Sequence, residues 1–356
     1  MSKKNKKDFF KDIVALSAAV VLIVNMLAGC SVVERITGQT PTGDFGSNIP
    51  RIGLITGEGG VTDPYYQKAW DGMQEAQREL QAGIGYVKIK SDKDYPSRLT
   101  ELSEDNCEMI VTLGQNAVSA VADAAKKNPK ITYICLDGSL DSPIPANVLG
   151  VSYKIEEAAF LAGILTGKMT KSKVVGFISG DNSEASQRYF YGFKSGLRTV
   201  DSSSELLKGL AGTFTDKARV EKIAVRMINS QADVVFNVAG TAGNSIIKVM
   251  NQYGKYAIGS DLDQNYLAPK RVMTSVIKYN DKVLLDIIKK FKDKQLVLGK
   301  NNIYGLAEEG VGLGETTKNM VSDELYEKII QYQENIISGK IKVPADENTY
   351  FEYLDN

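Results

Sequence analysis

The sequence predicts an α/β protein made of two three-layer lobes, in each of which helices cover both faces of a parallel sheet. After Pro50, short apolar runs typical of buried strands alternate with amphipathic stretches typical of helices. The linkers are short, and strand–helix–strand crossovers of this kind produce parallel strands. The chain has 356 residues, which is too long for one ordinary domain and suits two lobes of roughly 130–150 residues each.

The amino-terminal end has the features of an export signal. Lysines at positions 3–11 precede an apolar run over residues 13–24. The motif Leu27-Ala28-Gly29-Cys30 closes this run and resembles a bacterial lipobox, in which the cysteine becomes the lipid-bearing first residue. We therefore expect residues 1–29 to be a signal peptide and Cys30 to anchor the protein by lipid to the extracytoplasmic face of the cell membrane. The alternative is a single membrane-spanning anchor, for which residues 13–29 are at the short limit.

Residues 30–49 are rich in Ser, Thr, Gly and Pro, and we expect a flexible tether there. The strand candidates that follow fall into two sets, before and after a helix that starts at Glu156. We expect an amino-terminal lobe of residues 50–154 plus about 279–313, a hinge, and a carboxyl-terminal lobe of residues 155–278 plus about 314–356. Apolar, strand-like runs predict strands over residues 51–56, 85–90, 109–113, 132–136, 148–152, 174–179, 205–210, 234–238, 256–260 and 273–278. Amphipathic periodicity predicts helices over residues 67–80, 117–127, 156–169, 186–199, 217–230, 242–253 and 281–293.

The composition favours a binding protein over an enzyme. Lys and Arg number 43, as do Asp and Glu, so there is no basic excess with which to bind nucleic acid. The chain has no histidine, which removes Ser-His-Asp and Cys-His catalysis and imidazole-bound zinc. Cys107 and Cys135 lie in or beside apolar runs and are interpreted as buried free thiols. We expect no cofactor and no metal.

Residues that directly follow the predicted strands are the site candidates, because ligands of open parallel sheets bind beyond the carboxyl ends of the strands. Carboxylates there can accept hydrogen bonds from ligand hydroxyls, tyrosines offer stacking faces, and glycines let the backbone approach a ligand. Asp263 favours a helix N-cap. The glycines at 57–60 are out of register for a dinucleotide loop. The candidates at these strand ends are Tyr65, Tyr66, Asp137, Val238, Gly240, Asp261 and Lys278.

From about residue 52 to residue 344 the chain resembles the basic membrane protein family of substrate-binding lipoproteins, which includes purine nucleoside receptors. The motifs occur in the family's order along nearly the whole body. They include Gln67-Lys68-Ala69-Trp70-Asp71-Gly72, Glu157-Ala158-Ala159-Phe160-Leu161-Ala162-Gly163, Ala257-Ile258-Gly259-Ser260-Asp261-Leu262-Asp263-Gln264, Ser275-Val276-Ile277-Lys278 and Gly310-Val311-Gly312-Leu313.

The resemblance implies a fold of the type I periplasmic-binding-protein kind, with a nucleoside held between two lobes. It implies delivery to an ABC-type permease and ATPase by a monomeric receptor. An aromatic ring at Tyr65 or Tyr66 would face a second ring at Phe214. In the same comparison Asp137 and Asp261 become polar ligand contacts. Lys278 lies beside Asp261 at the ribose hydroxyls, while Val238 and Gly240 line the wall.

Two departures from the family pattern lie on the side that recognises the base. Gly57 stands where the family usually has Asp, and Tyr65-Tyr66 replaces a usual Phe-Asn pair. We therefore expect a nucleoside receptor whose base preference is relaxed or shifted. The alternatives are a sugar receptor, a ligand sensor of the same fold, and an extracellular nucleoside-cleaving enzyme that uses Asp137 or Asp261.

Overall fold

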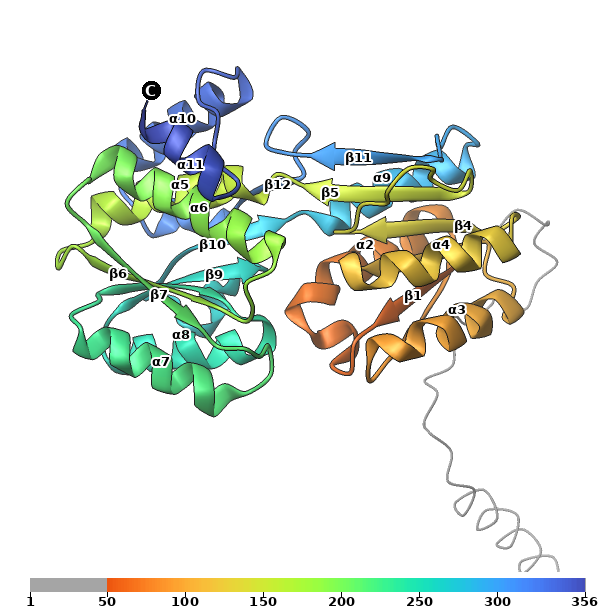
Figure 1. Cartoon of the computed structure of the whole chain (residues 1–356), viewed down its shortest axis with the longest axis horizontal. Coiled ribbons are helices and arrows are strands. Elements are labelled where there is room, and N and C mark those ends of the chain that lie inside the picture. Colours follow the sequence, from red (N-terminus) through yellow and green to blue (C-terminus); the bar gives the residue numbers. More distant parts are fainter. Residues whose placement is uncertain (1–49, 356) are drawn as a thin grey trace, which may run out of the picture. The chain divides into compact units, whose positions relative to one another are not determined.

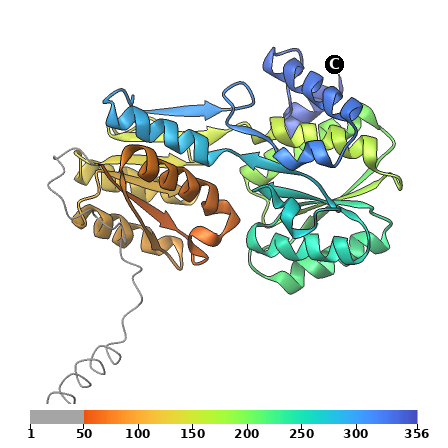
Figure 2. The same cartoon turned by 180° about the vertical axis from the view of Figure 1, so that it is seen from behind.

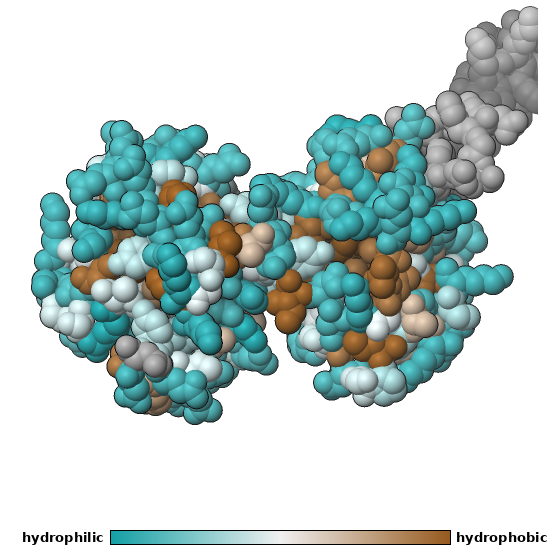
Figure 3. Space-filling model, turned by 90° about the horizontal axis from the view of Figure 1, so that it is seen from above, coloured by the Kyte–Doolittle hydropathy of each residue, from teal (hydrophilic) through white to brown (hydrophobic). Residues whose placement is uncertain are grey.

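The computed structural model describes residues 50–355, which form two sheets with helices on both faces of each (Figure 1; Figure 2). The predicted signal peptide, the lipidation site at Cys30 and the tether lie outside these residues. Among residues 50–355, no helix is both long enough and apolar enough to cross a bilayer. The face drawn in Figure 3 is covered mostly by hydrophilic side chains, with smaller apolar patches between them.

The first sheet has six strands in the order β11-β5-β4-β3-β1-β2. All its neighbouring strands are parallel, so their carboxyl ends lie along one edge. Helices α2 and α9 pack together on one face, and α3 and α4 pack together on the other (Figure 1). The strands are β1 (Arg51–Thr56), β2 (Gly83–Lys88), β3 (Met109–Leu113), β4 (Thr132–Leu136), β5 (Val148–Tyr153) and β11 (Lys300–Tyr304), and the helices are α2 (Pro64–Leu80), α3 (Tyr95–Glu104), α4 (Val118–Lys127) and α9 (Asn280–Lys292).

The second sheet has six strands in the order β12-β10-β9-β8-β6-β7. Its strands are parallel except for β12, which runs antiparallel to β10. Helices α5 and α6 cover one face, α7 and α8 cover the other, and α10 and α11 pack outside α5 and α6. The strands are β6 (Val174–Ser179), β7 (Glu205–Leu210), β8 (Val234–Val238), β9 (Tyr256–Asp261), β10 (Val272–Lys278) and β12 (Val311–Leu313), and the helices are α5 (Ile155–Met169), α6 (Glu184–Val200), α7 (Lys217–Asn229), α8 (Gly243–Gln252), α10 (Asp323–Ile337) and α11 (Glu347–Leu354).

The two sheets repeat one strand order and differ in the direction of one edge strand, which is parallel in β11 and antiparallel in β12. Strands β1 to β5 and β11 occupy the same places in the first sheet as β6 to β10 and β12 in the second. The chain passes between the sheets from β5 to α5, from β10 to α9 and from β11 to β12. Short 3-10 turns connect some elements: η1 (Gly60–Thr62), η2 (Asp92–Asp94), η3 (Gln115–Ala117), η4 (Gly240–Ala242), η5 (Gln264–Leu267) and η6 (Glu315–Asn319).

The two-lobed α/β architecture expected from the sequence is confirmed. Every strand that the apolar runs predict is present. Most of these runs are buried on both faces of their sheets, whereas the edge strand β7 is half-exposed. The pairing of β12 with β10 places residues 311–313 in the second sheet. The last passage between sheets therefore comes a few residues earlier than the expected boundary at about 313. Strand β11 lacked an apolar signal because it is a polar, half-exposed edge strand.

Close packing of α5 on α6 positions the helix that carries Tyr189. A Cβ atom placed on Gly196 would lie 2.0 Å from the carbonyl oxygen of Phe160, so a side chain at position 196 would force these helices apart. Helix α5 is buried along most of its length because it lies between the second sheet and α10.

Candidate functional site

A lysine–carboxylate pair joins the carboxyl ends of the two sheets. The Lys278 ammonium, at the end of β10, donates to Oδ2 of Asp137 at 2.6 Å, and Asp137 directly follows β4. The Tyr65 hydroxyl donates to the same oxygen at 2.9 Å. Lys278 is only 4% exposed, and a buried ammonium requires a partner of opposite charge.

Two tyrosine rings flank this lysine. The Lys278 nitrogen lies 5.8 Å from the ring centroid of Tyr65 and 5.6 Å from that of Tyr189. Both separations are within the range of a cation–π interaction. Tyr65 comes from the first lobe and Tyr189, on α6, from the second, so the ammonium is held by groups from both lobes.

Asp261, at the end of β9, adds a second carboxylate to Asp137 and Lys278, and these three residues are called the cluster below. It accepts a hydrogen bond from the Tyr189 hydroxyl at 3.2 Å. Burial raises the pKa of Asp261; Lys278 opposes this shift and the charge of Asp137 adds to it. The charges of Lys278 and Asp137 therefore both act on the Asp261 carboxylate. Among residues 50–355, Lys278 makes its ion pair with Asp137 and none within 4.0 Å of Asp261.

Both carboxylates stand on left-handed backbone. Asp137 has a φ of 55° and Asp261 a φ of 67°. Asp is one of the few residues with a side chain that adopts this region at modest cost. The conformation ends each strand abruptly and puts a carboxylate at the edge of its sheet.

The start of α2 determines where the two candidate tyrosines lie. Asp63 caps the helix by accepting from the Tyr65 amide at 3.0 Å, and Pro64 follows at the first helical position. The rings of Tyr65 and Tyr66 meet edge to face at 5.1 Å, so they point in different directions. Tyr65 reaches Asp137, whereas a Cβ on Gly57 would lie 3.4 Å from the Tyr66 ring. Burial raises the pKa of Tyr66 to about 12.

Phe214, Val238 and Gly240 lie together in the second lobe. Phe214 is 44% exposed, and its ring covers Gly180: a Cβ there would lie 2.3 Å from the ring. Gly240 has a φ of 54°, and a Cβ on it would lie 3.3 Å from Phe214. Val238 is buried at the end of β8. Within residues 50–355 no ring contact joins Phe214 to Tyr65 or Tyr66. That one of these tyrosines faces Phe214 across a ligand stays a prediction.

Sequence reasoning did not single out Tyr189 or the buried amide network behind Asp261. Gln264 accepts from the Ser260 amide at 3.0 Å and donates to Asn244 at 2.9 Å, and Asn237 donates to Gln264 at 3.3 Å. These bonds fix the loops that follow β8 and β9. The signal for Tyr189 was its place in the topological repeat, because α6 follows β6 as α2 follows β1.

Several other polar candidates have structural roles. Asp263 caps η5 and accepts from the Thr316 amide at 3.0 Å. Cys107 and Cys135 are buried free thiols, as expected. Burial raises the pKa of Cys135 to about 12, which keeps the thiol protonated. Residues 50–355 contain no cluster of three His, Cys, Asp or Glu side chains that could hold a metal ion.

The chain matches the family described as ABC transporter substrate-binding protein PnrA-like over residues 51–347. It is 30% identical to the ABC transporter nucleoside-binding protein BmpA of Lactococcus lactis, over 94% of this chain and 99% of the relative. It is also 30% identical to basic membrane protein A of Borreliella burgdorferi, over 88% of this chain and 93% of the relative.

Solved structures share the fold at lower identity. An ABC transporter solute-binding protein from Aeropyrum pernix superposes with a TM-score of 0.75 at 20% identity, covering 86% of this chain and 96% of the other. A transcriptional activator of the comK gene from Bacillus halodurans superposes with a TM-score of 0.72 at 20% identity, covering 83% of this chain and 99% of the other. Proteins with different roles therefore share this architecture, and the ligand must be argued from the site.

Proposed function

Because the chain belongs to the family of PnrA-like ABC transporter substrate-binding proteins, we propose that it captures a nucleoside between its two lobes for import through an ABC-type permease and ATPase. The observation that carries this proposal is the cluster of Asp137, Asp261 and Lys278, built from the carboxyl ends of both sheets. A ligand bound there would contact both lobes at once, which couples binding to their arrangement. The name of the Lactococcus relative supports a nucleoside.

The charges of the cluster suit ribose hydroxyls. A hydroxyl can donate to a carboxylate and accept from an ammonium, so the ribose can use Asp137, Asp261 and Lys278 together. Phe214, which is 44% exposed, offers a face for the base. Base–aromatic stacking contributes about 1–3 kcal/mol and tolerates every base.

Base preference is proposed to be relaxed or shifted, because position 57 has no side chain to read the base edge. The Tyr66 ring stands 3.4 Å from the place where a Cβ of residue 57 would be. A buried carboxylate selects bases that donate a hydrogen bond to it, because a base without such a donor leaves the buried charge unpaired. An aromatic ring makes no such demand.

The proposal places the protein outside the cytoplasm as a monomer anchored through Cys30, with residues 1–29 removed as a signal peptide. Substitution of Cys30→Ser should abolish lipidation and leave a soluble or unprocessed form. Metabolic labelling with a fatty acid and cell fractionation measure this. Unchanged labelling and membrane attachment would contradict the anchor.

Calorimetric titration with adenosine, guanosine, uridine, ribose and free bases tests the proposed ligand, alongside chromatography for released base. We expect all three nucleosides to bind, with no more than about a hundredfold spread in Kd. Binding of sugars alone would favour a sugar receptor, and release of free base would favour an enzyme. If neither nucleosides nor ribose bind, the ligand class is wrong.

A further inference from the structure

Two tyrosine–aspartate pairs occupy equivalent places in the two lobes. Tyr65 lies on α2, which follows β1, and Tyr189 lies on α6, which follows β6. Strands β1 and β6 have the same position in their sheets. Asp137 follows β4 and Asp261 ends β9, and these strands also have the same position. The pairing of tyrosine with aspartate is thus repeated with the topology.

The geometry of the two pairs is also matched. The Tyr65 hydroxyl donates to Oδ2 of Asp137 at 2.9 Å, and the Tyr189 hydroxyl donates to Oδ1 of Asp261 at 3.2 Å. Both aspartates have a positive φ, of 55° and 67°. The Lys278 nitrogen is 5.8 Å from one ring centroid and 5.6 Å from the other.

Each tyrosine satisfies one oxygen of its carboxylate and leaves the other open. Among residues 50–355, Oδ1 of Asp137 and Oδ2 of Asp261 accept no hydrogen bond from the protein. The Asp137 side chain is 16% exposed, and Asp261 is half-buried. A carboxylate oxygen has two lone pairs. A ligand hydroxyl can therefore donate to the open oxygen of a carboxylate whose rotamer the tyrosine has already fixed.

The tyrosines are permanent donors. Burial first, and then the neighbouring carboxylates, raise the pKa of Tyr65 and of Tyr189 well above the ordinary value. Both phenols therefore keep their protons at physiological pH, and their hydroxyls cannot become anions that would repel the aspartates.

We infer that Tyr65 and Tyr189 are matched positioning residues that orient Asp137 and Asp261, so that the site selects ligands with two hydroxyl groups, one for each carboxylate. This inference rests on the proposed function and deepens it. It assigns the two tyrosines to discrimination between ribonucleosides and deoxynucleosides rather than to recognition of the base. A site with fixed acceptors rejects an analogue that lacks the donor, because an acceptor is then left unpaired.

The test titrates the full chain in detergent, as wild type and as Tyr65→Phe and Tyr189→Phe variants, with adenosine, 2′-deoxyadenosine and 3′-deoxyadenosine. Tyr253→Phe, at an exposed tyrosine outside the cluster, is the matched control. Wild type should bind adenosine at least about tenfold more tightly than either deoxynucleoside. Each site variant should weaken adenosine binding by about tenfold. With one of the two deoxynucleosides, the same variant should bind as tightly as wild type, because the hydroxyl that this ligand lacks is the one that would bind the carboxylate oriented by the tyrosine.

A pH profile separates positioning from a structural role. Asp261 is faced by Lys278, Asp137, Tyr189 and Asp63, and the Tyr189 hydrogen bond lowers its pKa. Tyr189→Phe should therefore move the acid-side loss of adenosine affinity to higher pH, while Tyr253→Phe should leave the midpoint unchanged.

The outcomes are distinguishable. Adenosine affinity and a pH midpoint unchanged in both site variants overturn the inference and leave the nucleoside receptor standing. If a site variant weakens the binding of adenosine and of both deoxynucleosides by the same factor, the inference is also overturned, because the tyrosine would then stabilise the fold rather than orient one carboxylate. If Tyr189→Phe unfolds, as thermal denaturation would show, Tyr65→Phe decides. Failure of wild type to bind any nucleoside contradicts the proposed function itself, and the inference with it.

Discussion

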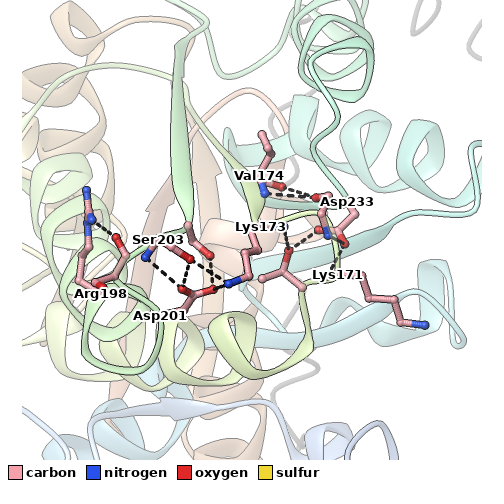
Figure 4. Close-up of polar contacts among 11 residues, drawn as sticks. Lys171, Lys173, Val174, Arg198, Asp201, Ser203 and Asp233 are labelled. Atoms are coloured by element: carbon pink, nitrogen blue, oxygen red, sulfur yellow. Dashed lines mark hydrogen bonds and ion pairs between the residues drawn. The ribbon is translucent and has the colours of Figure 1, made fainter.

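Aspartates at the two ends of the second sheet differ in how many hydrogen bonds their carboxylates accept. At the amino ends of the strands, Asp233 accepts from the Thr170 hydroxyl at 2.6 Å and from the amides of Lys171 and Ser172 at 2.7 and 3.0 Å (Figure 4). Asp201 likewise accepts from the Ser203 and Ser204 hydroxyls at 2.6 and 2.9 Å. At the carboxyl ends of the strands, the Asp261 carboxylate accepts one hydrogen bond, from the Tyr189 hydroxyl.

The pKa values differ accordingly. Burial would raise the pKa of Asp233, but the hydrogen bond from Thr170 and those from the backbone amides lower it. The hydroxyls of Ser203 and Ser204 lower the pKa of Asp201 to about 2. Burial raises that of Asp261. Fully coordinated carboxylates hold loops in place, whereas an under-coordinated carboxylate costs stability and offers a ligand the missing contact.

The largest effect should come from removing the cation of the carboxyl end. Lys278→Met leaves the Asp137 carboxylate without its buried partner and the ribose without a donor. We expect nucleoside binding to weaken by about 2–5 kcal/mol, measured by calorimetry. The matched control at the other end, Lys173→Met, should bind normally. Full affinity in Lys278→Met would place the site elsewhere.

Replacing one aspartate at each end of the second sheet should change stability in different ways. Asp233→Asn loses a charged acceptor for its donors, so the free energy of unfolding should fall by about 1–3 kcal/mol. Asp261→Asn should leave it unchanged or raise it, because a disfavoured buried charge is removed. Urea denaturation measures both. Equal destabilisation by the two substitutions would remove the contrast between the ends.

Acid should act on the two ends with opposite sign. The folded-state pKa of Asp201, about 2, lies below the unfolded value of about 3.9. Its stabilising contribution is therefore present above about pH 4 and is lost as the pH falls towards 2. The raised pKa of Asp261 means that the folded state takes up that proton first, so any stability gained by Asp261→Asn should disappear on acidification. Denaturation at a series of pH values checks both signs; a loss with the same sign at both residues would contradict them.

The smallest effect concerns an exposed ion pair. Lys173 lies 3.7 Å from Asp201, and its side chain is 59% exposed. Lys173→Ala should change the free energy of unfolding by less than about 1 kcal/mol. A larger loss would show that the lysine, rather than the serine hydroxyls, holds this loop.

The buried framework was predictable because each strand carries its own signal. The run Val234-Val235-Phe236 is apolar at every position, and a strand with both faces covered needs that pattern. The edge strand β11 was missed for the converse reason, because Lys300-Asn301-Asn302-Ile303-Tyr304 has no continuous apolar face. Helix α11 packs at the outside of α5 and α6, and Tyr350 is its one buried side chain.

By itself the sequence determined the alternation of strands and helices, and hence that Asp137, Asp261 and Lys278 lie at strand ends, because periodicity and strand-terminal position are local properties. Only the tertiary structure decided which groups meet. Tyr65 reaches Asp137 while its neighbour Tyr66 lies beside Gly57, and Lys278 pairs with the aspartate of the other sheet. Tyr189 reaches Asp261 across 72 positions in the chain. Such contacts depend on how two sheets and their covering helices pack, and no local pattern in the chain records that packing.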